Sequence, residues 1–137
     1  STEEGMHTLR YSLYPHKAKA MVDVVRRSFE FNDELIPVNQ GAHKGKLPRS
    51  SQMIGLSPDN LVLTTLKKAE DGDDIIARFY EIDGKQCTAV VTFPKDIPMA
   101  HTANLLEEDV AALTPAGKSV TVKTGPYEIA TIRLGMG

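Results

Sequence analysis

Apolar and polar side chains alternate along much of the chain, which is the pattern of half-buried β-strands. The strongest alternation runs from Asn60 to Phe93 (NLVLTTLKKAEDGDDIIARFYEIDGKQCTAVVTF). Two turn signals divide this stretch, namely the acidic segment 70–74 and the pair Asp83-Gly84. An Asp-Gly pair favours a tight hairpin because glycine readily takes the positive φ that such turns need. We therefore predict three consecutive strands whose neighbours pair antiparallel.

Shorter alternating segments extend this pattern in both directions along the chain. Strands are predicted at residues 6–14, 52–56, 60–66, 74–82, 85–93, 99–106, 118–124 and 126–134. One segment has helical spacing instead: Ala18–Phe31 places Met21, Val25 and Phe29 on one face and charged residues mostly opposite. Many short strands at this spacing are typical of a β-sandwich. The expected fold class is all-β, an antiparallel β-sandwich with one amphipathic helix near the N-terminus.

Composition divides the chain into three parts. Residues 37–51 (PVNQGAHKGKLPRSS) contain few apolar side chains but two glycines and two prolines, so we expect a linker or exposed loop. Residues 1–36 hold the first predicted strand and the helix, and residues 52–137 hold the remaining strands as a sandwich. The alternative is that all three parts form one compact module.

Overall charge and cysteine content exclude several classes of protein. The net charge of −2 provides no basic field for nucleic acid, and no apolar run is long enough to span a bilayer. The single cysteine, Cys87, excludes an internal disulfide, and its place in an alternating strand favours a buried structural thiol. The single cysteine and the absence of an Asn-x-Ser/Thr glycosylation site together favour a cytoplasmic, prokaryotic protein. Because the chain begins at Ser1 without methionine, we favour an excised fragment over a processed start.

The search for catalytic and metal-binding motifs assigns no residue. The histidines lie far apart and none pairs with a ligand at a metal-chelating interval; they are His7, His16, His43 and His101. The acidic segment 70–74 lacks the ligand spacing of a calcium loop, so we interpret it as a hydrated hairpin tip. We therefore expect no catalytic residue and no metal site in this chain.

Two residues remain as candidate substrate contacts. Arg78 lies in the middle of a predicted strand, on the face opposite Ile75, Ala77 and Phe79. It either extends along the sheet into solvent or directs its guanidinium at the oxygens of a ligand or partner. Asn104 either caps a turn or offers its amide to a sugar hydroxyl. The solvated arginine and the capping asparagine are the readings we favour on the residues alone.

Several segments, in order along the chain, resemble the C-terminal end of the α-mannosidases of glycoside hydrolase family 38. They are LRYSLYPH (9–16), VVRRSFEFNDEL (24–35), NLVLTTLKKAEDGDDIIARFYEIDGK (60–85), ANLLEE (103–108) and YEIATIRL (127–134). Each segment is weak evidence alone, but the ordered set covers nearly the whole chain and is specific. One departure from the family is His101-Thr102-Ala103, where members often carry an aromatic and an acidic residue before the asparagine.

The resemblance implies a role outside catalysis. Family members are retaining exo-α-mannosidases whose N-terminal α/β domain holds the zinc ion and the nucleophile, and neither has a counterpart here. Zinc is accordingly expected in the missing catalytic domain, and residues 1–36 resemble the last strand and helix of the preceding β region. The implied function is a non-catalytic C-terminal domain that packs on and shapes the catalytic region. Its expected partners are the catalytic and central domains of the parent chain and mannose-containing glycans, with Arg78 and then Asn104 as candidate contacts.

The alternative is an autonomous β-sandwich module that binds carbohydrate or protein. Carbohydrate-binding modules commonly use exposed aromatic rings as platforms for sugars. Here tryptophan is absent, and the four tyrosines and four phenylalanines mostly occupy core-like positions, which argues against such a module. A protein-interaction module would instead expose an apolar patch.

Overall fold

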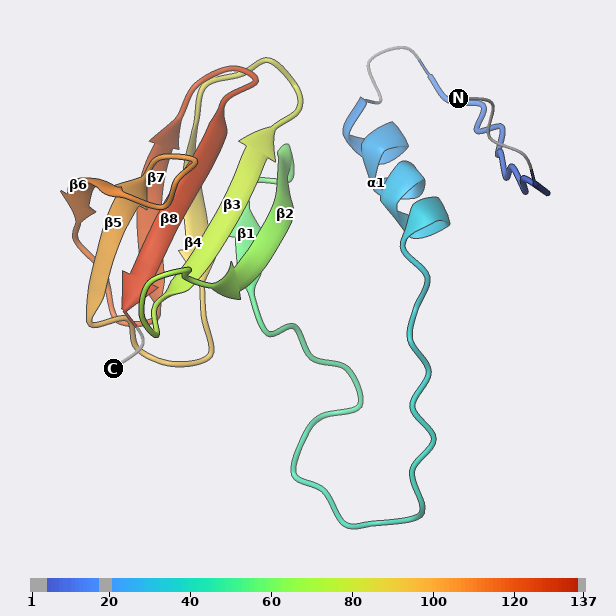
Figure 1. The fold of residues 1–137 in the computed structure, drawn as a ribbon, viewed down its shortest axis with the longest axis horizontal. Coiled ribbons are helices and arrows are strands. Elements are labelled where there is room, and N and C mark those ends of the chain that lie inside the picture. The colour runs from blue at the N-terminus through green and yellow to red at the C-terminus, as the bar shows by residue number, and fades with distance from the viewer. Residues whose placement is uncertain (1–4, 18–20, 136–137) are drawn as a thin grey trace. The chain divides into compact units, whose positions relative to one another are not determined.

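The computed structural model describes residues 5–17 and 21–135. The described residues divide into two compact units, with the boundary between Asn39 and Gln40. The elements are α1 (Met21–Asn32), β1 (Gly55–Ser57), β2 (Leu61–Lys68), β3 (Ile75–Glu81), β4 (Cys87–Thr92), β5 (Met99–Ala103), β6 (Asp109–Leu113), β7 (Ser119–Thr124) and β8 (Ile129–Gly135) (Figure 1). The three-part division drawn from composition stays a prediction.

The first unit consists of an extended segment and the helix α1. The predicted helix is confirmed from Met21 onward, whereas residues 18–20 lie outside the described residues. It ends where the Asn32 side chain donates to the Ser28 carbonyl oxygen, at 2.8 Å. The predicted strand at 6–14 is wrong: these residues carry no regular secondary structure, because no other described segment pairs with them.

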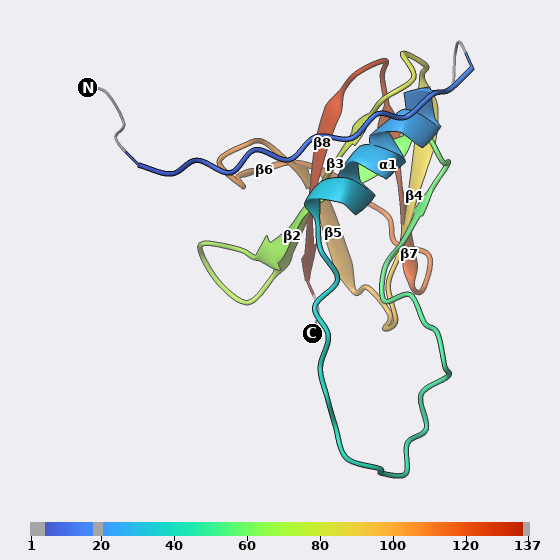
Figure 2. The same cartoon turned by 90° about the vertical axis from the view of Figure 1, so that its right-hand side faces the viewer.

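The second unit is an antiparallel β-sandwich, which confirms the predicted fold class. One sheet has the strand order β1-β4-β7 and the other has the order β2-β3-β8-β5-β6. Every pairing within both sheets is antiparallel, and the two sheets lie as separate layers (Figures 1 and 2).

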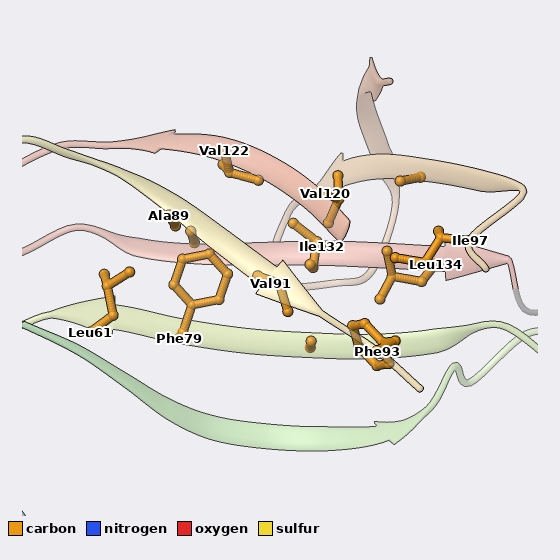
Figure 3. Close-up of a cluster of buried hydrophobic side chains, with 13 residues drawn as sticks. Leu61, Phe79, Ala89, Val91, Phe93, Ile97, Val120, Val122, Ile132 and Leu134 are labelled. Carbon is orange, nitrogen blue, oxygen red and sulfur yellow. The ribbon is translucent and has the colours of Figure 1, made fainter. Parts of the chain in front are cut away.

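The core lies between these layers and draws apolar side chains from both. Phe79 and Ile132 of the larger sheet and Ala89 and Val91 of the smaller sheet are completely buried, and Val120 is almost so (Figure 3). Alternation explains this arrangement, because every second side chain of a strand points to the same face. The opposite face of the five-stranded sheet, here called the outer face, carries the alternate side chains, which include the polar Arg78 and Thr131 and the apolar Ile76 and Ile129.

The prediction of three consecutive strands with antiparallel neighbours, between Asn60 and Phe93, is only half confirmed. The acidic turn joins β2 and β3 as an antiparallel hairpin, with Leu61 opposite Glu81. The expected hairpin at Asp83-Gly84 is wrong, because β3 pairs with β2 and β8 while β4 pairs with β1 and β7. The turn instead carries the chain from one sheet to the other. This crossing lets the apolar faces of β3 and β4 bury each other, which pairing side by side would not do.

Two predicted strands also differ at their ends. The strand predicted at 99–106 ends at Ala103, because Asn104 begins a tight loop in which Glu107 has a φ of 69°. The structure then adds β6, which the pattern does not reveal since four of its five residues are exposed. The strand predicted at 126–134 begins only at Ile129, after Tyr127 with a φ of 55°.

Candidate functional site

Arg78 lies on the outer face of the five-stranded sheet, as its position in the alternation predicts. Its neighbours Ala77 and Phe79 are buried, and Phe79 faces the core. The Arg78 Nε donates to Thr131 Oγ1 on β8 at 3.0 Å, and Nη2 donates to the Leu105 carbonyl oxygen at 3.3 Å. The guanidinium therefore joins two strands to the loop 104–108. Whether it also contacts a substrate stays a prediction.

Asn104 begins that same loop, so the structure brings the two candidate residues to one place. Its Oδ1 accepts the backbone N–H groups of Leu106 and Glu108 at 2.8 and 3.1 Å. Its Nδ2 donates to the Glu108 carboxylate at 2.7 Å. These bonds are those of a loop cap. The Asn104 amide thus holds the loop that receives Arg78, while its contact with a sugar stays a prediction.

A shallow depression of about 410 Å³ opens beside Arg78 on the outer face. It is lined by Thr64, Arg78, Tyr80, Glu81, Tyr127 and Ile129. Tyr127 and Ile129 are 72% and 59% exposed, so the rim of the depression is apolar. Tyr80 could have been placed here from sequence, since it lies two residues beyond Arg78 on the same face. Tyr127 could not, because only the crossing of the chain between sheets brings it to this face.

Glu81 is the most extensively bonded side chain at this site, and it is 1% exposed. Its carboxylate accepts the amide N–H groups of Asp83, Gly84, Lys85 and Tyr127 at 2.7 to 3.1 Å. The Asn60 side chain also donates to it, at 2.6 Å. Burial by itself would raise the pKa of Glu81, but these five hydrogen bonds favour the charged form and lower its pKa to about 2.

Two further charged groups fix the loops that border the outer face. Arg133 donates from Nε to Asp74 at 2.7 Å and from Nη1 to the Asp71 carboxylate at 3.0 Å. Glu107 is 6% exposed and forms an ion pair with Lys67 at 2.7 Å. The hydrogen bond from Lys67 lowers the pKa of Glu107. The acidic segment 70–74 is therefore held against the sheet by Arg133, which sequence reasoning missed.

Glu81 and Glu107 act as hydrogen-bond acceptors for backbone amides in the described structure. A glycosidase needs one carboxyl group whose pKa is raised so that it can donate a proton. The pKa values of Glu81 and Glu107 are both lowered, so each stays ionised as a hydrogen-bond acceptor. In the described part of the chain, no three His, Cys, Asp or Glu side chains gather as metal ligands, so these residues do not fit a zinc ion. Burial raises the pKa of the Cys87 thiol, which makes it a poor nucleophile.

The described helix is too short to cross a membrane, so the structure contains no candidate membrane-spanning helix among its described residues.

Comparison with known proteins places this chain in a family. The model of the glycosyl hydrolases family 38 C-terminal beta sandwich domain matches residues 60–132, more than half of the chain. Alpha-mannosidase G of Dictyostelium discoideum is 27% identical over 134 residues, which cover 94% of this chain and 12% of that protein. The alpha-mannosidase of Saccharomyces cerevisiae is 26% identical over 158 residues, covering 95% of this chain and 14% of that protein.

A bacterial relative is more distant. The putative mannosylglycerate hydrolase of Halalkalibacterium halodurans is 24% identical over 130 residues, covering 94% of this chain and 14% of that protein. The chain thus spans 12–14% of the length of these curated relatives. The match to the sandwich model, together with the observed two-sheet fold, shows that the chain belongs to the C-terminal beta sandwich domain family of the family 38 glycosyl hydrolases.

Proposed function

We propose that this chain is the non-catalytic C-terminal domain of an α-mannosidase-like glycoside hydrolase. Its role is to pack on the catalytic and central regions of the parent enzyme and to hold their geometry. Zinc and the reacting carboxylates belong, in this proposal, to the catalytic domain. The chain contributes a rigid sandwich with loops fixed by Glu81, Glu107 and Arg133.

The observation that carries this proposal is the apolar rim of the outer-face depression. Tyr127 and Ile129 are exposed, and Arg78 of the same depression donates to the loop whose Leu105 and Leu106 are 67% and 79% exposed. Burying such side chains stabilises an interface by about 25 cal/mol for each Å² removed from water. The rigid loops beneath them favour docking, because little conformational freedom is lost when such a surface is covered.

The test is association with the polypeptide encoded ahead of Ser1, expressed as a separate protein. We expect a complex in analytical ultracentrifugation, and recovery of mannosidase activity when the two parts are mixed. Ile129→Lys should weaken the complex by about tenfold or more, since a charge would be buried against the partner. Leu66→Lys is the matched control. Leu66 is 47% exposed, but it pairs with Ala77, which is fully buried in the core, so both lie on the face opposite the outer face. Absence of a complex would contradict the proposal.

A second candidate function is recognition of a mannose-containing glycan at the same depression. It is supported by the Tyr80 and Tyr127 rings, which line the depression together with the Arg78 guanidinium. Aromatic faces stack on sugars, and arginine donates paired hydrogen bonds to oxygens. Titration of mannose oligosaccharides into the isotope-labelled chain separates the candidates. Localised NMR shifts at these three residues would support glycan recognition. An unchanged spectrum would contradict it and leave packing on the parent enzyme as the remaining candidate.

A further inference from the structure

The chain contains two Asp-Gly pairs, Asp71-Gly72 in the turn between β2 and β3 and Asp83-Gly84 in the turn after β3. In such a pair the glycine nitrogen can attack the side-chain carboxyl of the aspartate, because glycine has no side chain to obstruct the approach. The attack closes a five-membered succinimide ring, and the proximity of the two groups favours this intramolecular reaction. The reacting groups are the same in both pairs, so the surrounding structure decides which pair reacts.

The second pair is held by the Glu81 carboxylate. The N–H groups of Asp83 and Gly84 each donate to Glu81 at 2.7 Å. The attack requires the glycine nitrogen to lose its proton, which the adjacent negative charge opposes. Glu81 is also too weak a base to remove that proton, since its pKa is lowered to about 2. The Asp83 carboxylate pairs with Lys85 and is only 28% exposed. The structure therefore protects Asp83-Gly84.

The first pair lies in an exposed turn. The Asp71 side chain is 80% exposed, and residues 70–73 are all exposed. Among the described residues, no acceptor binds the Gly72 N–H. Gly72 also has open space around it, since an added Cβ would come no closer than 3.8 Å to the nearest atom, Arg133 Nη2. The nitrogen that must react is therefore neither bonded nor covered.

Arg133 is the group that restrains the reacting aspartate. Its Nη1 donates to the Asp71 carboxylate at 3.0 Å, and its Nη2 donates to the Asp71 carbonyl oxygen at 2.9 Å. This fork holds the side chain and the backbone of Asp71 together, and its positive charge favours the ionised carboxylate. Cyclisation instead needs the neutral carboxyl group, which loses its hydroxyl. Asp71 must therefore leave Arg133 before it reacts.

We propose that Asp71 is a site of spontaneous covalent modification to isoaspartate, at a rate that Arg133 controls. The Gly72 nitrogen bonds to Cγ of Asp71, and the amide proton and the carboxyl hydroxyl leave as water. A water molecule then adds to the main-chain carbonyl of the ring and breaks its bond to nitrogen. The chain afterwards runs through Cβ and Cγ, and the α-carboxylate is free. Nothing is oxidised or reduced, and atoms balance because one water leaves and one enters.

The modification changes the turn that joins β2 to β3. The carbonyl oxygen that accepts from Arg133 becomes part of the new carboxylate, and the backbone gains one methylene. The turn is closed by the bond from Ala69 N–H to the Asp74 carbonyl oxygen at 2.8 Å, so a longer backbone loosens this hairpin. The free α-carboxylate is a substrate for methyltransferases that esterify isoaspartate with S-adenosylmethionine. This inference goes beyond the proposed function and does not depend on it.

The test incubates the 137-residue chain in buffer and follows both pairs by peptide mass spectrometry. Electron-transfer fragmentation distinguishes isoaspartate from aspartate, and an isoaspartyl methyltransferase with labelled S-adenosylmethionine measures the product independently. We expect isoaspartate to form at Asp71 at least about tenfold faster than at Asp83, because the reactive geometry is reached by local opening of the turn. In urea, where neither turn is held, the two pairs should react at similar rates.

Variants separate the role of Arg133 from that of the turn itself. Arg133→Lys should accelerate the reaction by about threefold or more, because lysine cannot hold side chain and backbone together. Unmodified Asp83 in the same samples shows that the sandwich stays folded. Lys68→Ala is the matched control, since it removes an exposed ion pair with Asp73 in the same turn and should leave the rate unchanged. Asp71→Glu should abolish methyl transfer, because glutamate would have to close a larger ring.

Three results would overturn the inference. Equal rates at the two pairs in the folded chain would show that the structure does not select between them. If Asp71 reacts in urea but not in buffer, the closed turn protects it and the site does not exist in the native chain. If Arg133→Lys reacts at the rate of the unchanged protein, Arg133 does not control the modification.

Discussion

The Glu81 carboxylate accepts the backbone N–H of Tyr127 at 3.0 Å, across 46 positions of the sequence. The same carboxylate accepts three amides of the turn that follows β3. The buried Glu81 side chain therefore fixes two loops at the depression: the turn that leads from β3 to β4 and the loop that precedes β8. The position of Tyr127 beside Arg78 depends on this acceptor.

Replacing Glu81 should destabilise the sandwich strongly. Glu81→Ala leaves four backbone donors and the Asn60 amide without their acceptor, and each buried donor left unpaired costs about 1–3 kcal/mol. Because water enters part of the space, we expect a total loss of about 3 kcal/mol or more in the free energy of unfolding. Urea denaturation measures it. Glu128→Gln is the control, since the exposed Glu128 carboxylate accepts one amide, that of Gly125; a loss of equal size there would contradict the assignment.

The stability of the domain should fall in acid because of the same group. The pKa of Glu81 is lowered to about 2 in the folded chain, from an ordinary value near 4.5. A lowered pKa means that its stabilising contribution is fully present above about pH 4.5 and is lost as the pH falls toward about 2. Urea midpoints measured from pH 5 to pH 2 should therefore decrease. In Glu81→Gln this decrease should be shallower; identical slopes in the two proteins would refute the contribution.

The backbone conformation at Gly84, more than the space around it, requires a glycine at this position. Its φ is +69°, and an added Cβ would meet the Tyr127 ring at 2.7–2.9 Å. The contacts are with the far end of an exposed ring, which can turn away. We therefore expect Gly84→Ala to cost about 1–2 kcal/mol, the penalty of left-handed backbone.

A double-mutant cycle separates the two causes. In the Tyr127→Ala background, Gly84→Ala should cost nearly the same, with a coupling energy under about 0.5 kcal/mol. A coupling above about 1 kcal/mol would show that the Tyr127 ring is fixed in place.

Arg133 should control the order of the acidic turn. Its guanidinium also donates from Nη2 to the Asp71 carbonyl oxygen, at 2.9 Å. Arg133→Lys keeps the charge but loses the fork that reaches Asp71 and Asp74 together, so amides of residues 70–74 should exchange faster. Lys68→Ala removes only an exposed ion pair with Asp73 and should change little. Equal exchange in Arg133→Lys and the unchanged protein would contradict this role.

Local pattern was sufficient to locate most elements and to orient their side chains. Alternation placed Arg78 opposite Phe79, and the structure confirms that orientation because side-chain direction follows directly from strand geometry. The helix from Met21 was equally readable from its apolar spacing. The Asp83-Gly84 turn was recognised as a positive-φ position, which Gly84 confirms.

The sequence did not predict which strands pair with one another. Nothing local distinguishes a turn within one sheet from a turn between two sheets, so the pairing of β3 with β8 was not predicted. Segment 6–14 carries a strand pattern without a neighbouring strand in the described structure, and β6 forms a strand with little alternation because its neighbour β5 supplies the hydrogen bonds.

The sequence by itself therefore determined the fold class, the family and the face on which Arg78 lies. Only the tertiary structure decided that Glu81 gathers two loops, that Asn104 and Arg78 meet at one loop, and that Tyr127 completes the depression. The physical reason is that alternation encodes burial one residue at a time. Strand pairing and loop closure instead depend on backbone groups, which are the same for nearly every residue, and on contacts between distant segments.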